Sequence, residues 1–234
     1  MILVVDCYLN EQGGAPNFIR QLEGRAHQVT RPPHEPLPEL SGWSAVVLTG
    51  SAACLANGYE GEDHHRSGWS SELVQWTRRV VDSGIPVLGV CFGHQVLGAA
   101  FGAPVRKAAA PEGGFKRVVV HTADPLFDRL GSSFITFLSH EDEVVAIPDL
   151  QLLASTPDCA VQSFRVPGRQ AWGVQFHTEM QPPEIEELLL MRREKHGLAM
   201  DMATELAQIP VAAEVAPKLF GRFLELTSSS VQRP

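Results

Sequence analysis

The nine residues Val87-Leu-Gly-Val-Cys-Phe-Gly-His-Gln95 place a cysteine directly after a run of apolar residues. We expect residues 86–90 to form a buried strand that turns sharply into a helix at Cys91. Gly89 and Gly93, two positions either side of the cysteine, leave room for the tight turn that projects a nucleophile from a sheet edge. At a helix N-terminus the macrodipole favours a thiolate, and nearby backbone N–H groups can hold an oxyanion. The alternative is a core cysteine, because free cysteines are among the most buried residues.

The composition is that of a soluble globular protein, since 44% of the 234 residues are hydrophobic and 20% are charged. The length suits one large α/β domain, and we expect a single domain over residues 1–234. The formal net charge of −8, without a basic stripe, argues against general binding to nucleic acid or anionic membranes. No apolar run approaches the roughly 20 residues that cross a bilayer, and residues 1–6 are typical of a first strand rather than a secretory leader.

The four cysteines are far apart and form no Cys-x-x-Cys pair, so the sequence predicts neither a zinc site nor a disulfide framework. Such cysteine usage favours a reducing cytoplasm as the location. His64 and His65, beside Glu62 and Asp63, form a grouping that suggests metal ligands. Because adjacent residues point in different directions and no third ligand spacing follows, we interpret this segment as a solvated loop and predict no metal and no cofactor.

Strand-like runs alternate with helical periodicity through the first half of the chain, the pattern of a parallel sheet covered by helices on both faces. The expected strands there are residues 2–5, 28–30, 45–48 and 86–90. The expected helices are residues 16–22, a segment from Trp69 that ends at Ser83-Gly84, and a segment after Cys91.

Farther along the chain, strand-like runs follow one another directly, at residues 116–121, 134–139, 150–155, 160–165 and 171–176. Turn signals such as Pro157-Asp158 separate them, so we expect hairpins that extend the sheet in antiparallel fashion. Helices are expected at residues 184–196, 202–207 and 215–226, followed by a frayed tail over 228–234. The predicted fold class is α/β, an open, mixed and mainly parallel sheet flanked by helices, with an antiparallel extension.

The last expected strand runs directly into His177-Thr178-Glu179. In an extended chain residues i and i+2 point to the same side, so His177 and Glu179 share a face. The carboxylate can then orient the imidazole while the other ring nitrogen faces a thiol, as in a catalytic triad. A lone histidine is more often structural than catalytic, but together with the cysteine at the turn this pattern favours a triad of Cys91, His177 and Glu179.

Two segments, Gly89-Val-Cys-Phe-Gly-His-Gln95 and Gly173-Val-Gln-Phe-His-Thr-Glu179, resemble the signature motifs of class I, triad-type glutamine amidotransferases, whose fold is flavodoxin-like. Leu48-Thr-Gly-Ser51 resembles their glycine-rich oxyanion loop, and Ser139-His-Glu-Asp142 resembles the segment that helps line the glutamine pocket. The resemblance spans nearly the whole chain. It is greatest to free-standing proteins related to the amidotransferase domain of GMP synthase, a group that also resembles the γ-glutamyl peptidases.

The resemblance implies that Cys91 is the nucleophile, His177 the general base and acid, and Glu179 the residue that orients the imidazole. It also implies an oxyanion hole formed by the backbone N–H groups of Phe92 and of the Gly50-Ser51 turn. Gln95 is implied to contact the substrate glutamine. The implied residues of the pocket rim are Ser139, His140 and Asp142. For the three rim residues, the alternative is a strand end capped by polar side chains.

Two segments depart from the family pattern. Thr178 stands where the family usually has proline, which removes rigidity but no catalytic group. The stretch Ala108-Ala-Ala-Pro-Glu-Gly-Gly-Phe115 departs more, and we expect it to be a substrate-facing loop that alters substrate choice.

Hydrolysis of glutamine to glutamate and ammonia is the activity that the resemblance implies. Because no synthetase domain fits in the remaining sequence, transfer of ammonia would need a separate synthetase partner. Two alternatives remain open. One is a γ-glutamyl peptidase that acts on small γ-glutamyl conjugates. The other is an inactive relative that serves as a binding module, against which the presence of all three triad residues argues.

Overall fold

The structure is a computed structural model that describes the chain except for residues 59–60, 63, 197–200 and 229–234. Within the described residues, nine strands form a sheet in the order β2-β1-β3-β4-β9-β8-β7-β5-β6. The parallel half contains β1 (Ile2–Val5), β2 (His27–Thr30), β3 (Ala45–Leu48), β4 (Val87–Val90) and β9 (Ala171–Val174). The antiparallel half contains β5 (Val105–Val120), β6 (Ser133–Val144), β7 (Gln151–Ser155) and β8 (Ser163–Arg165). The predicted mixed sheet with an antiparallel extension is confirmed.

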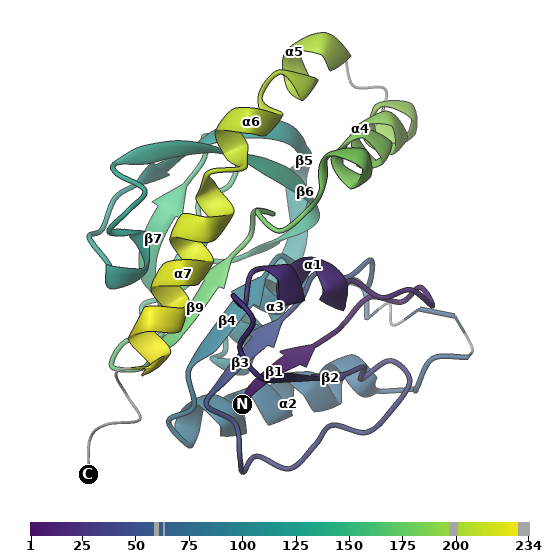
Figure 1. Cartoon of the computed structure of the whole chain (residues 1–234). Helices are drawn as coiled ribbons and strands as arrows, with labels where there is room; N and C mark the ends of the chain where they lie inside the picture. Colours follow the sequence, from purple (N-terminus) through teal and green to yellow (C-terminus); the bar gives the residue numbers. More distant parts are fainter. Residues whose placement is uncertain (59–60, 63, 197–200, 229–234) are drawn as a thin grey trace.

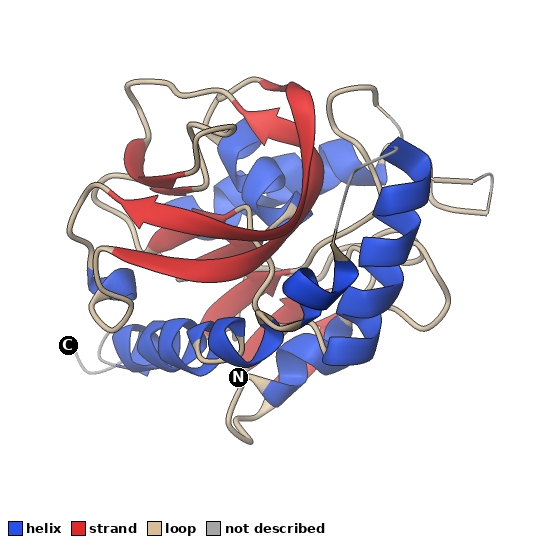
Figure 2. Ribbon diagram, turned by 90° about the horizontal axis from the view of Figure 1, so that it is seen from above, coloured by secondary structure: helices blue, strands red, loops and turns tan. Residues whose placement is uncertain are grey.

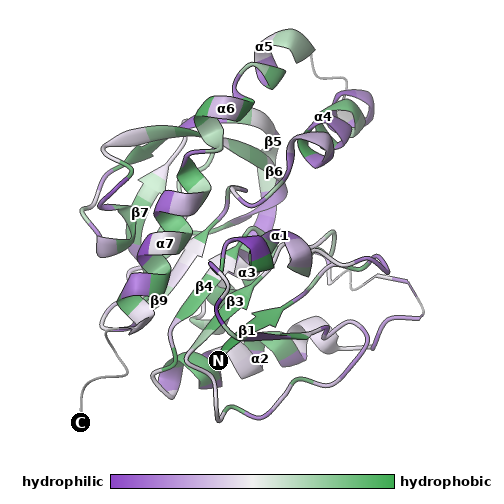
Figure 3. Ribbon diagram, viewed as in Figure 1, coloured by the Kyte–Doolittle hydropathy of each residue, from purple (hydrophilic) through white to green (hydrophobic). Residues whose placement is uncertain are grey.

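Helices cover both faces of the parallel half (Figure 2). Because side chains alternate along a strand, Ile2 and Val4 pack on one face and Leu3 and Val5 on the other. On the first face lie α1 (Ala15–Arg20) and α7 (Val215–Ser228), whose buried side chains include Phe18, Leu219 and Phe220. On the second lie α2 (Trp69–Asp82) and α3 (Phe92–Ala100), with Trp69, Trp76 and Val96. The central strands β1, β3 and β4 are fully buried and mainly hydrophobic, as their green colour in Figure 3 shows.

The stretch Ala108 to Phe115, expected to be a loop, lies within β5 instead. Strand β5 pairs with β6 on both sides of an irregularity between Lys107 and Glu112, so a bulge takes up the extra residues. The three alanines and the proline of this bulge, residues 108–111, lack the alternation by which a strand is recognised, which is why the sequence pattern missed it. Strand β6 likewise continues past the predicted end at Ser139, to Val144.

Three further helices complete the described fold: α4 (Pro182–His196), α5 (Met202–Leu206) and α6 (Ile209–Ala212), besides a short 3₁₀ turn, η1 (Pro125–Phe127). Helix α4 stands beside β5 and β6, and α5 and α6 lead back to α7 (Figure 1). The packing of α4 rests on Ile185 and Leu189, which contact Phe137 of β6. Of the predicted tail, Ser228 is the last residue of α7, and residues 229–234 lie outside the described residues. None of the described helices is long and apolar enough to cross a membrane.

Candidate active site

The carboxyl ends of the parallel strands meet at one edge of the sheet, the usual position of ligand sites in open α/β sheets. Cys91 follows β4 directly, Gly50 lies two residues after β3, and His177 lies three residues after β9. A cavity of about 800 Å³ opens at this edge, and both Cys91 and His177 line it. The structure therefore brings together residues that are far apart in the sequence.

Cys91 occupies the sharp turn that the sequence predicted. It is the N-cap residue of α3 and has φ 52° and ψ −103°, a backbone conformation that costs a non-glycine residue about 1–3 kcal/mol. The strain is held in place by neighbouring elements, since the Cys91 amide donates to the carbonyl of Val174 in β9 at 2.8 Å. The side chain is 5% exposed, so a little of it reaches the cavity.

The two flanking glycines allow this turn because nothing larger fits. A Cβ at Gly89 would lie 2.3 Å from the carbonyl oxygen of Gly93, and a Cβ at Gly93 would lie 2.4 Å from that of Leu48. The amide of Gly93 also donates to the carbonyl of Thr49 at 3.0 Å. Strand β4, the start of α3 and the end of β3 thus pack backbone against backbone.

His177 is held on three sides. Its Nδ1 lies 2.8 Å from Oε1 of Glu179, a fully buried carboxylate whose other oxygen accepts from the amide of Thr178. The backbone of His177 is fixed by hydrogen bonds with Phe137 and Thr136 of β6. Because Glu179 engages Nδ1, the ring orientation is set and the other nitrogen is left for a second partner.

Cys91 lines the same cavity as His177, and its charge acts on the imidazole. Burial by itself lowers the pKa of His177, but the negative charges of Cys91 and Glu179 outweigh it and raise the pKa well above its ordinary value of 6.5. The arrangement thus favours a proton on His177.

The Gly50-Ser51 turn lies against the same imidazole. A Cβ at Gly50 would be 3.2 Å from Cε1 of His177 and 3.2 Å from the hydroxyl oxygen of Tyr8, so a side chain there would displace one of them. The hydroxyl of Thr49 accepts from the amide of Cys7 and donates to the carbonyl of Gly50, which fixes the turn. Ser51 lines the cavity, as does Phe92, whose amide belongs to the first turn of α3, where N–H groups have no partner within the helix.

Gln95 lies one turn after Cys91, whose carbonyl accepts from its amide, and it lines the cavity. Its side-chain amide donates to the carbonyl of Asp142 at 3.3 Å and to Oε1 of Gln175 at 3.2 Å. Gln175 in turn places its Nε2 3.6 Å from the sulfur of Cys91. The sequence interpretation missed Gln175, although alternation along the strand puts it on the same face as His177.

Ser139, His140 and Asp142 also line the cavity, but within β6 rather than at a strand end. Protein groups already engage all three side chains, and the hydroxyl of Ser139 accepts from Nε of Arg192 at 3.1 Å. The ring of His140 lies between Oε2 of Glu112 and the carbonyl of Asp142, at 3.0 Å from each. The carboxylate of Asp142 contacts Nζ of Lys107 at 2.9 Å and the thiol of Cys54 at 2.7 Å.

Glu112, His140 and Cys159 are close enough to one another to suggest metal ligands. However, the oxygens of Glu112 accept hydrogen bonds from Thr156 and Gln162, besides contacting His140. These protein contacts explain why the carboxylate is buried.

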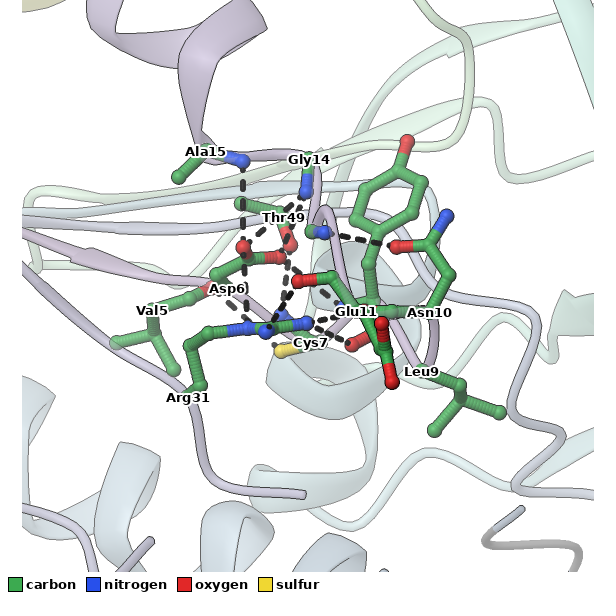
Figure 4. A network of polar contacts seen from close by, with 12 residues as sticks. Val5, Asp6, Cys7, Leu9, Asn10, Glu11, Gly14, Ala15, Arg31 and Thr49 are labelled. Atoms are coloured by element: carbon green, nitrogen blue, oxygen red, sulfur yellow. Dashed lines mark hydrogen bonds and ion pairs between the residues drawn. The ribbon is translucent and has the colours of Figure 1, made fainter. Parts of the chain in front are cut away.

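Tyr8 is a cavity residue that the sequence did not reveal, and a polar network supports the loop that carries it (Figure 4). The carboxylate of Asp6 accepts from the amides of Tyr8, Gly14 and Ala15. Arg31 donates to the carbonyls of Tyr8, Asn10 and Glu11. Burial, together with the charges of Glu179 and Cys91, raises the pKa of Tyr8 well above 10.0, so the phenol stays neutral.

The histidine-rich segment predicted to be a solvated loop contributes to the cavity wall through His64 and His65. Nδ1 of His65 accepts from the amide of Glu62, and its Nε2 pairs with the carbonyl of Leu9 at 2.9 Å. Both ring nitrogens of His65 are therefore occupied by the protein. Asp63 lies outside the described residues.

Residues 3–194 match the family model "Glutamine amidotransferase class-I". The chain is 37% identical to a glutamine-hydrolyzing GMP synthase subunit of Methanococcus vannielii over 111 residues, 47% of this chain and 59% of that protein. It is 30% identical to the corresponding protein of Saccharolobus solfataricus over 154 residues, 65% of this chain and 76% of that protein. The match to the first of these relatives thus spans less than two thirds of its length.

Solved structures share the fold. A putative GMP synthase subunit from Thermoplasma acidophilum superimposes with a TM-score of 0.72 at 24% identity, covering 99% of this chain and 95% of that one. A glutamine amidotransferase from Methylobacillus flagellatus gives a TM-score of 0.77 at 22% identity, covering 96% and 94%.

Proposed function

The chain belongs to the class I glutamine amidotransferase family, and from this premise we propose that it hydrolyses the side-chain amide of glutamine with Cys91 as the nucleophile. One observation carries the proposal: Cys91, at a strained turn, lines the same cavity as His177, whose Nδ1 is 2.8 Å from the buried carboxylate of Glu179. A nucleophile, a base and an orienting group in this order are what acyl transfer requires.

In the first half of the proposed reaction, the Cys91 thiolate attacks the amide carbon of glutamine and forms a C–S bond. Backbone N–H groups of Phe92 and of the Gly50-Ser51 turn hold the negative oxygen, a contribution worth about 10²–10³ in rate for each donor. His177 then gives its proton to the nitrogen, the C–N bond breaks, and ammonia leaves behind a γ-glutamyl thioester.

In the second half, His177 removes a proton from water, and the resulting hydroxide attacks the thioester carbon. The C–S bond breaks, glutamate leaves, and the proton stays on His177, which restores the starting pair. Glu179 remains a carboxylate throughout and stabilises the imidazolium.

The remaining cavity residues have proposed roles in binding. Gln95 contacts the substrate, because its amide lies between the nucleophile and the cavity-facing strand β6. Asp142 supplies a negative charge suited to the substrate ammonium, with Lys107 beside it. Ser139 and His140 shape the rim, and the contact of His140 with Glu112 keeps the imidazole in place.

A second candidate is the hydrolysis of γ-glutamyl peptides or conjugates by the same steps, with an amine in place of ammonia. The cavity volume of about 800 Å³ favours it, because pockets for drug-sized ligands span roughly 300–1,000 Å³ and glutamine is smaller than such ligands. The inactive alternative is disfavoured by the presence of Cys91, His177 and Glu179 and by the contact between the last two.

We further propose that the chain forms one cytoplasmic domain and passes ammonia to a separate synthetase protein. The names of the Methanococcus vannielii and Saccharolobus solfataricus relatives, both GMP synthase subunits, support such a partner.

Release of ammonia and glutamate by the purified chain tests the proposal. We expect turnover of glutamine, or of γ-glutamyl-glycine, that Cys91→Ala abolishes. Brisk turnover of glutamine without a partner would rule out an obligate complex. If the purified chain hydrolyses neither compound, with or without a synthetase, the proposed activity is wrong.

A further inference from the structure

Arg192 is a buried cation on the cavity wall that the proposed reaction does not use. It lies in α4, its side chain is 7% exposed, and it lines the cavity with Cys91 and His177. Its position is fixed by helical spacing, since Ile185 and Leu189, seven and three residues earlier, pack α4 onto Phe137. Ile185, Leu189 and Arg192 therefore lie on the side of α4 that packs against the rest of the protein.

The hydrogen-bonding capacity of this guanidinium is only partly used within the protein. Its Nε lies 3.1 Å from the hydroxyl oxygen of Ser139, whereas Nη1 is buried and has no hydrogen-bond partner among the described residues. The carboxylate oxygen that faces Nη1, Oε1 of Glu141, is 3.8 Å away, which is beyond hydrogen-bonding distance. Buried charged donors without a partner are rare, and they point to a group that binds there.

Glu141 does not satisfy this donor because its charge is shared among other cations. Its Oε1 is 2.5 Å from Nζ of Lys195, and its Oε2 is 3.8 Å from Nζ of Lys107. The hydrogen bond from Lys195 is the main reason why the pKa of Glu141 is lowered. The Glu141 carboxylate is therefore already hydrogen-bonded to Lys195. Among the described residues, Arg192 therefore shares its nearest carboxylate, that of Glu141, with Lys195 and Lys107.

Arg192 is also electrostatically coupled to the nucleophile. Burial lowers the pKa of Arg192, while the charges of Glu141 and Cys91 act in the opposite direction. Because both residues line one cavity, a group bound by Arg192 lies in the same cavity as the thiol of Cys91.

We propose that Arg192 binds a carboxylate group of the substrate. A planar guanidinium matches a carboxylate through two parallel hydrogen bonds, and the open Nη1 supplies one of them. The inference rests on the proposed function, because γ-glutamyl compounds bring carboxylates to Cys91. Glutamine carries one at its α-carbon, and γ-glutamyl-glycine carries a second one on its leaving group.

The first experiment measures anion recognition without turnover, by alkylating Cys91 with iodoacetate, an anion, and with iodoacetamide, its neutral analogue. We expect the ratio of the two rates to fall about 10-fold in Arg192→Met, the loss of roughly one hydrogen bond to a charged group. The control is Arg193→Met, which removes the exposed neighbouring arginine and should leave the ratio unchanged. Arg192→Lys, which keeps the charge, should fall in between and serves if the methionine variant does not fold.

The second experiment identifies the source of the carboxylate from kcat/KM. The substrates are glutamine, γ-glutamyl-glycine, γ-glutamyl ethylamide, and glutamine with its α-carboxylate converted to an amide. If Arg192 binds the α-carboxylate, Arg192→Met slows the first three substrates and spares the last. If it binds the leaving group, only γ-glutamyl-glycine is slowed.

An unchanged alkylation ratio in Arg192→Met, or an equal effect on all four substrates, would overturn the inference. If the wild-type protein hydrolyses none of the four, the proposed function fails instead, and the alkylation ratio still decides whether Arg192 recognises a carboxylate beside Cys91.

Discussion

The parallel and antiparallel halves of the sheet contribute to the cavity in different ways. In the parallel half, the geometry around Cys91 is set by backbone contacts, because Gly89 and Gly93 allow three segments to touch directly. In the antiparallel half, contacts between side chains set the geometry, as between Lys107 and Asp142 and between Glu112 and His140. Under the proposed function, the chemistry takes place in the half that is packed backbone against backbone, and the side chains of the other half contribute to substrate binding.

The two halves also differ in how they hold charge. In the parallel half, His177 and Glu179 are almost completely buried, so their interaction is weakly screened. In the antiparallel half, Lys107 and Arg106 are largely solvent-exposed partners of buried or half-buried carboxylates. Such pairs contribute about 0–1 kcal/mol to stability, so substitutions there are expected to change binding more than folding.

The largest effect is expected from the orienting carboxylate of the parallel half. Glu179→Gln keeps the shape but removes the charge that stabilises the imidazolium, and kcat should fall about 10⁴-fold. Steady-state kinetics of ammonia release by the wild-type protein and the variant measure this. A loss of less than about 10-fold would mean that His177 does not depend on Glu179.

The next effect concerns the backbone contacts around the nucleophile. Gly93→Ala places a Cβ 2.4 Å from the carbonyl oxygen of Leu48, so we expect a loss of about 1–3 kcal/mol in the free energy of unfolding and loss of activity. The matched control is Gly221→Ala in α7, where the nearest atom would be 3.6 Å away. That change should leave stability unchanged or raise it by up to about 1 kcal/mol. Equal denaturation midpoints for the two variants would refute the contrast.

A smaller effect is expected in the antiparallel half. Asp142→Asn removes the charge that faces Lys107 and Cys54, and we expect KM to rise about 10-fold, the loss of one charged hydrogen bond, with little change in kcat. Separate measurement of kcat and KM tests this. A fall in kcat at constant KM would instead place Asp142 in the chemical step.

The smallest effect is the pH dependence of stability. The pKa of folded His177 is raised above its ordinary value of 6.5, so its pairing contributes stability that is fully present below pH 6.5. The contribution is lost as the pH rises through the folded pKa. Urea denaturation of wild type and His177→Asn should therefore show the larger difference at pH 6 than at pH 9. A difference that grows with pH would contradict the direction of the pKa shift.

The parallel half of the sheet was easier to predict from the sequence than the antiparallel half. The turn at Cys91 and the His177-x-Glu179 pattern are local, so spacing and alternation were enough to place them. The bulge between Lys107 and Glu112 was not predictable, because it is defined by pairing with β6 and not by any pattern of its own. His140 was placed in the pocket by resemblance, but its partner Glu112 is distant in sequence.

Arg192 illustrates what local patterns leave undetermined. Arg192 and Arg193 are identical neighbours in a charged helix, yet one is buried and the other exposed. Only the stripe formed by Ile185 and Leu189, and the strand on which it packs, distinguishes them. Once the buried face of the helix is known, the helical period predicts that Arg192 is buried and Arg193 is exposed.

The central claim is that a protonated His177 activates the thiol of Cys91, and the pH profile of Cys91 alkylation by iodoacetamide tests it most directly. In the wild-type protein the rate should stay high and nearly constant between pH 6 and pH 8, because His177 holds the proton. In His177→Asn the rate should rise with pH as for an ordinary thiol, whose pKa is about 8.5. Coincident profiles for the two proteins would contradict the account.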